Sequence, residues 1–115
     1  MLVNRTTANI IKLTIASEVT IAVGDVIGIS SEEAVLADKD LEISAVGLAK
    51  SVQGSIVYIQ TNGKFANTDA GENYWLGTSG SLVNTVPTSG MVQQIGKRAD
   101  NQNILIDIDK TVIIL

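Results

Sequence analysis

The acidic side chains are the groups of this sequence that could do chemistry. They gather in three places: Glu32 and Glu33; Asp38 and Asp40; and Asp100, Asp107 and Asp109. Calcium needs about six to eight oxygen ligands, usually from a loop with D-x-D-x-D-G-like spacing, and that spacing is absent. We therefore predict a solvated acidic face and no metal site, while the sequence leaves open whether Asp107 and Asp109 bind a cation.

Composition excludes the catalytic chemistry of His and Cys. The chain has no His and no Cys, so Ser-His-Asp triads, thiol nucleophiles and the usual nitrogen and sulfur zinc sites cannot form. The run GTSGS at 77–81 lacks the Lys-Ser/Thr of a phosphate-binding loop and the spacing of a dinucleotide fingerprint, so it predicts a hairpin turn. We expect no enzyme activity and no cofactor.

A hydrolase working with two carboxylates is the least favoured function. Composition permits such a pair, but carbohydrate-cleaving clefts usually carry aromatic platforms, and this chain has one Trp, two Tyr and one Phe. Tyr74 and Trp75 are adjacent in a predicted strand and should point to opposite faces. One of them is expected in the core, and the other on the surface or at a subunit contact.

Charge and hydrophobicity argue against nucleic acid and membrane as partners. The net charge is −4, and the eight cationic residues are scattered along the chain, without the basic stripe of a nucleic-acid-binding protein. No apolar run approaches the roughly 20 residues of a membrane span, and the first residues lack the pattern of a signal peptide. The sequence predicts a soluble single domain with an aliphatic core.

The hydrophobic pattern predicts an all-β fold. Short segments with a period of two, separated by Gly, Asn, Ser and Asp turns, are typical of a small β-barrel or β-sandwich. We expect about eight to ten short, mostly antiparallel strands. They are expected within residues 9–16, 26–30, 43–50, 55–60, 73–76, 82–83, 91–99 and 103–109, and residues 19–23 also alternate.

Three connecting regions are less regular. Ser30 followed by Glu33 could form a capping box that opens a helical turn, but a short strand within residues 30–41 is favoured. Asn62-Gly63 between apolar runs predicts a type I′ hairpin turn. Residues 67–71 are a polar connector that we expect to separate two halves of the domain.

The two halves resemble each other. Residues 22–29 match 70–77, residues 34–36 match 81–83, residues 46–50 match 95–99, and residues 56–59 match 104–107. The offset stays between 47 and 49 residues. We interpret these matches as a repeated β unit.

The two ends differ from the body at 9–110. Residues 1–8 lack strand alternation and are expected to be either an arm or a frayed terminus. Residues 111–115 (TVIIL) are expected to form a C-terminal apolar strand. That strand either completes a sheet of its own chain or is donated to a neighbouring subunit.

The segment GENYWLGTSGSLVNTVPTSGMVQQIGKRADNQNILIDID at 71–109 resembles a pattern of small virion proteins of tailed bacteriophages. The matching positions are Gly71, Tyr74, Trp75, Leu76, Gly77, Gly80, Leu82, Pro87, Ser89, Gly90, Val92, Gln93, Ile95, Gly96, Ala99, Ile104, Leu105 and Ile106. With the upstream AVGDVIGIS and ISAVGLAKS, the resemblance covers residues 22–109. Lys97-Arg98 departs from it, because the pattern more often has an uncharged residue after the glycine.

The resemblance implies a structural virion protein. Capsid decoration (cement) proteins and head- or tail-fibre modules both carry this β module. A chain of this length beginning at Met1 is large enough to be a whole decoration protein, so a homotrimer on the outer capsid surface is favoured. A fibre or adaptor module that contacts a host receptor or glycan is the alternative.

That role implies partners and a location. The major capsid protein and further copies of the chain are the expected partners, and the protein would be made in the host cytoplasm and located in the virion. The candidate contact residues are Leu2, Val3, Asn4 and Arg5 against the shell, and Val112, Ile113 and Ile114 between subunits.

Overall fold

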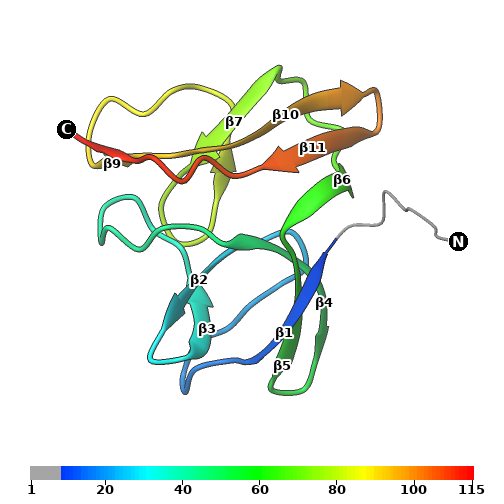
Figure 1. Ribbon diagram of the computed structural model, residues 1–115, viewed down its shortest axis with the longest axis vertical. Coiled ribbons are helices and arrows are strands. Elements are labelled where there is room, and N and C mark those ends of the chain that lie inside the picture. Colours follow the sequence, from blue (N-terminus) through cyan, green and yellow to red (C-terminus); the bar gives the residue numbers. More distant parts are fainter. Residues whose placement is uncertain (1–8) are drawn as a thin grey trace, which may run out of the picture.

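Over residues 9–115, the part that this computed structural model describes, the chain forms β-strands joined by turns and loops, with no helix (Figure 1). The strands are β1 (Ile10–Thr14), β2 (Val26–Ser30), β3 (Glu33–Leu36), β4 (Gly47–Gln53), β5 (Ile56–Gln60), β6 (Asn62–Ala66), β7 (Asn73–Leu76), β8 (Leu82–Val83), β9 (Met91–Val92), β10 (Gln94–Asp100), β11 (Asn103–Asp107) and β12 (Ile113–Ile114). Within these residues no helix is long and apolar enough to cross a membrane. The all-β prediction is confirmed, with twelve strands in place of eight to ten.

Two five-stranded antiparallel sheets form the body, and they have the same topology. The first has the order β1-β5-β4-β2-β3 and the second the order β6-β11-β10-β7-β8. Replacing each strand of the first sheet by its counterpart in the second reproduces the order. The predicted repeat is therefore confirmed, and it extends to a pair that the sequence match did not include, β1 and β6.

A glycine recurs at the same place in both units. A Cβ on Gly47 would overlap the carbonyl oxygen of Gln60 in β5, and a Cβ on Gly96 would overlap the carbonyl oxygen of Leu105 in β11. Three residues after each glycine the ladder contains a bulge, at Lys50 in β4 and at Ala99 in β10. Only glycine allows such a close approach between strands, so the same residue type is required twice.

The boundary between the two units lies at Thr61. The prediction of a hairpin turn at Asn62-Gly63 is wrong. Asn62 and Gly63 belong to β6, which pairs with β11 and not with the preceding β5. The side-chain amide of Gln60 donates to the carbonyl oxygens of Asn62 and Lys64 and holds the chain where it crosses between sheets. The connector at 67–71 therefore lies inside the second unit and does not separate the halves.

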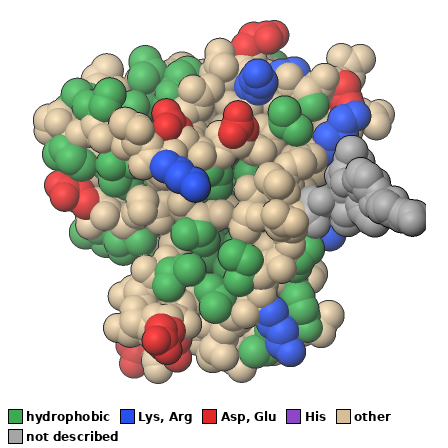
Figure 2. Space-filling view, in the orientation of Figure 1, with side chains coloured by type: hydrophobic (Ala, Val, Ile, Leu, Met, Phe, Trp, Pro, Cys, Tyr) green, Lys and Arg blue, Asp and Glu red, His purple; other side chains and the backbone are tan. Residues whose placement is uncertain are grey.

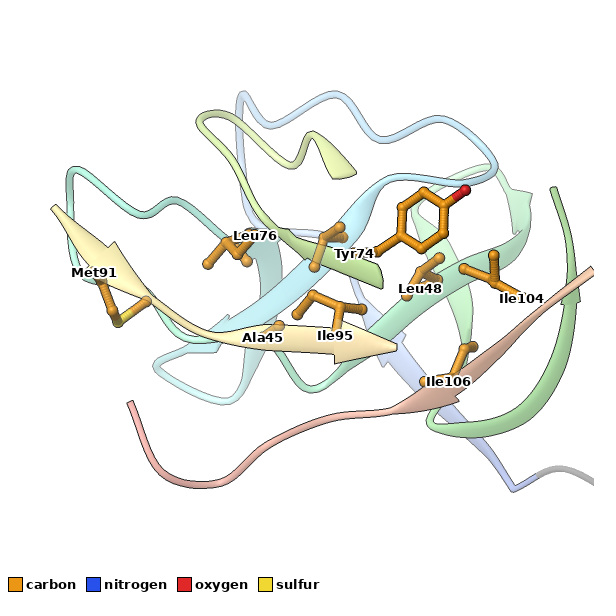
Figure 3. Packing of buried hydrophobic residues seen from close by; sticks show 10 residues of the cluster. Ala45, Leu48, Tyr74, Leu76, Met91, Ile95, Ile104 and Ile106 are labelled. Carbon is orange, nitrogen blue, oxygen red and sulfur yellow. The ribbon is translucent and has the colours of Figure 1, made fainter. Parts of the chain in front are cut away.

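The main core lies between the two sheets. Leu48 and Ala45 of the first unit meet Tyr74, Ile95 and Ile104 of the second, as Figure 3 shows. The cluster contains ten buried residues: Val26, Ala37, Ala45, Leu48, Tyr74, Leu76, Met91, Ile95, Ile104 and Ile106. Apolar surface from both sheets is removed from water in one place, which is the arrangement of a sandwich.

The first sheet has a second core on its other face, which includes Ile27, Val57 and Ile59. Part of its cover is the segment between β1 and β2, where Val19 and Ile21 pack inward while Val23 is exposed. The alternation in residues 19–23 thus belongs to a covering loop and not to a strand. The sheet curls until its two edges touch at the Ile15–Ala34 bridge, but neither sheet closes into a barrel.

Candidate functional site

The C-terminal segment returns to its own chain. Ile113 and Ile114 of β12 pair with Val92 and Met91 of β9, and the N–H of Leu115 donates to the carbonyl oxygen of Gly90 at 2.9 Å. Residues 111–115 thus take the first of the two arrangements that the sequence allowed. Ile113, Ile114 and Leu115 nevertheless remain 58%, 52% and 63% exposed.

Two loops join this segment at one end of the molecule. The loop between β3 and β4 carries Leu41, and the loop between β8 and β9 carries Val86. The N–H of Met91 donates to the carbonyl oxygen of Lys39 at 2.9 Å, which joins the first loop to β9. In Figure 1 both loops, β9 and the C-terminus lie on the left. Figure 2 shows apolar side chains over the same side.

We call this surface the apolar end. It comprises Leu41, Val86, Ile113, Ile114 and Leu115, which are five of the nine exposed large apolar residues in the described part of the chain. Single exposed apolar side chains are common on soluble proteins, but a group of them marks an interaction site. The apolar end is therefore the candidate functional site.

Asp38 fixes the loop that presents Leu41. Its buried carboxylate accepts hydrogen bonds from the N–H groups of Asp40 at 2.8 Å, Leu41 at 3.2 Å and Ser79 at 3.0 Å. Burial raises the pKa of Asp38, but these three N–H groups and the charge of Lys39 outweigh it and hold the pKa below its ordinary value. The sequence showed Asp38 only as part of an acidic group, because its partners are backbone atoms.

Lys39 connects the same loop to the loop between β8 and β9. Its ammonium group lies 3.0 Å from the Asp40 carboxylate and donates to the carbonyl oxygen of Ser89 at 3.0 Å. A Cβ at Gly90 would crowd Lys39 and Asp40, and the residue has a φ of +76°, so glycine suits this close approach. The charges of Lys39 and Asp40 beside the apolar end are thus paired with each other.

Gln93 braces the region from inside. Its buried side-chain oxygen accepts the N–H of Ala45 at 2.8 Å, and its amide nitrogen donates to the carbonyl oxygen of Asp109 at 3.0 Å. From its position between β9 and β10, this side chain therefore joins Ala45, just before β4, to Asp109, just after β11. Gln93 can make these contacts because it is buried. The residues next to it in the sequence do not predict that burial.

The carboxylates of Asp107 and Asp109 line a different surface feature, which includes no residue of the apolar end. Asp107 and Asp109 are exposed beside a surface hollow of about 400 Å³, which Lys97 and Lys110 also line. Asp100 is elsewhere: the Gln102 N–H, the Asn103 side chain and Lys64 lower its pKa to about 2. Within residues 9–115 no three acidic side chains come close enough to hold a metal ion.

The aromatic pair is divided as the sequence predicted. Tyr74 is fully buried, whereas Trp75 is partly exposed on the opposite face of β7.

Arg98 points inward, unlike its neighbour Lys97. Its guanidinium lies 5.4 Å from the centre of the Tyr74 ring and donates to the carbonyl oxygens of Gly71 and Asp69. Of the Lys97-Arg98 pair, Lys97 is exposed and Arg98 is only partly exposed.

The remaining candidate residues are placed differently. Val112 packs partly buried against the main core, so Ile113 and Ile114 are the predicted contact residues that face solvent. Leu2, Val3, Asn4 and Arg5 lie outside the described residues.

Comparison with protein families, curated proteins and solved structures found no match for this chain.

Proposed function

We propose that this chain is a bacteriophage capsid decoration (cement) protein that binds the outer capsid surface as a homotrimer. The major capsid protein would be its partner, and the virion surface its location after synthesis in the host cytoplasm. The resemblance of residues 22–109 to small virion modules motivates the proposal. The observation that carries it is the apolar end, because that surface suits the contact between copies that a homotrimer needs.

The mechanism is stabilisation by binding. A protein that binds only the assembled shell stabilises the shell in proportion to its occupancy. A cyclic trimer uses the same shell contact three times, and linking the three contacts raises the overall affinity well above that of one. A rigid two-sheet body suits this role because little conformational entropy is lost when it binds.

The fibre or adaptor alternative fits the structure less well. A glycan-binding tip is expected to carry an exposed aromatic residue on a loop. The four aromatic residues, Tyr58, Phe65, Tyr74 and Trp75, all lie in strands, and each is buried or partly buried.

Co-sedimentation with shells that lack decoration protein tests the proposal. We expect the protein to pellet with shells saturably and to raise the temperature at which they open. A variant lacking residues 2–8 separates the contribution of Leu2, Val3, Asn4 and Arg5 from that of the body. Absence of shell binding together with retention on a glycan array would replace decoration by the fibre role.

A further inference from the structure

We infer that the apolar end is the surface through which copies of this chain contact one another. This inference rests on the proposed homotrimer and deepens it by naming the contact. The occupant is a second copy of the chain, and three observations support that choice: the amount of exposed apolar surface, the charge distribution and a free strand edge.

The apolar end exposes a large amount of apolar surface. Leu41 is 69% exposed and Val86 is 54% exposed, and with β12 and Leu115 the exposed fractions amount to about three whole side chains. All five side chains are apolar, so burying them desolvates no charged group of their own side chains. The other four exposed large apolar residues, which are Ile10, Ile11, Val23 and Ile29, together expose a smaller amount.

The distribution of charged residues permits contact between identical chains at this end. The chain carries a net charge of −4, so copies repel one another at most orientations. At the apolar end Lys39 pairs with Asp40, and the Asp38 carboxylate is enclosed by N–H groups. Glu42 is the one other charged residue of that loop. Two copies that meet through this loop therefore experience repulsion mainly between their exposed Glu42 carboxylates.

The backbone offers a further means of attachment. β12 pairs with β9 along one edge, and within residues 9–115 no strand pairs with its other edge. An exposed edge strand with apolar side chains is a ready site for strand addition. A neighbouring copy could continue the β9–β12 sheet across the contact. Closed cyclic symmetry then gives every copy the same environment.

Two substitutions and a matched control test the inference. Ile114→Asp and Val86→Asp each place a carboxylate on the apolar end, at side chains that contribute little to the core. Val23→Asp makes a comparable change at an apolar side chain that is 64% exposed in the segment between β1 and β2. Sedimentation velocity of the purified full chain across a concentration series gives the oligomeric state, and urea unfolding checks that each variant remains folded.

We expect the unmodified protein to sediment as a trimer of the 12.1 kDa chain. Ile114→Asp and Val86→Asp should each raise the dissociation constant of the trimer at least about tenfold, while Val23→Asp leaves it unchanged. A monomeric unmodified protein, or folded variants that associate as tightly as it does, would overturn the inference.

Shell binding separates this inference from the proposed function. Variants that become monomeric but still pellet with shells support the inference and leave the decoration role in place. Variants that stay trimeric but no longer pellet would show that the shell protein occupies the apolar end, and they would overturn the inference while supporting the function.

Discussion

Replacing Asp38 by Asn tests how the apolar end is held in place. Both carboxylate oxygens of Asp38 accept hydrogen bonds, one from Asp40 and Leu41 and the other from Ser79. An asparagine side chain has only one oxygen, and its amide group would face at least one of these N–H groups donor to donor. The substitution keeps the size of the side chain, so the hydrogen bonds are the main change.

The expected loss of stability follows from those contacts. A hydrogen bond to a charged group contributes roughly 1.5–3 kcal/mol, and a buried donor left without a partner costs a similar amount. At least the Ser79 contact or the pair from Asp40 and Leu41 is lost. Asp38→Asn should therefore lower the free energy of unfolding by about 2 kcal/mol near pH 7, as measured by urea unfolding.

The difference should depend on pH with a definite sign. The pKa of Asp38 is lowered in the folded state, so its contribution is fully present above the unfolded pKa of about 3.9. That contribution is lost as the pH falls through the folded pKa, because the protonated group loses the same contacts. The gap between the two proteins should therefore narrow in unfolding experiments carried out near pH 3.

Asp40→Asn is the matched control. Asp40 is the neighbouring acidic residue, its side chain is 54% exposed, and its ion pair with Lys39 lies at the surface. This control should change the free energy of unfolding by less than about 1 kcal/mol. If Asp38→Asn has the same free energy of unfolding as the control, the hydrogen bonds to Asp38 do not stabilise the protein as proposed. The same holds if its loss in free energy of unfolding is equal at both pH values.

Four further substitutions test the fold. Gly47→Ala and Gly96→Ala should each lower the urea midpoint by the equivalent of roughly 2–3 kcal/mol, because both place a methyl group against a neighbouring strand; unequal losses would contradict the equivalence of the two units. Gln93→Leu should cost about 2–4 kcal/mol in urea unfolding because it leaves the Ala45 N–H without its partner, and a neutral result would show that this brace is dispensable. Arg98→Lys keeps the charge but loses the planar guanidinium over Tyr74. We expect a thermal midpoint several degrees lower and faster proteolysis within residues 67–72. Unchanged proteolysis would show that Arg98 does not hold residues 67–72 in place.

Local patterns were sufficient to predict most of the strands. β2, β5, β7 and β8 fall within the predicted ranges, because alternation and turn residues act over a few neighbours. The segment at 30–41 forms β3 and not a helical turn, as the internal match favoured. Residues 19–23 alternate too, but Val19 and Ile21 cover a core without joining a sheet, and alternation alone cannot distinguish the two cases.

The repeated sequence determined that this protein consists of two similar β units, and its composition removed the chemistry of His and Cys. The tertiary structure alone decided that β6 crosses to β11, so Asn62-Gly63 became part of a strand in place of a hairpin. It also brought Leu41, Val86 and the C-terminal strand to one end through hydrogen bonds between distant segments. Strand formation depends on neighbouring residues, whereas the pairing of strands and the burial of Asp38 and Gln93 depend on contacts between residues far apart in the chain.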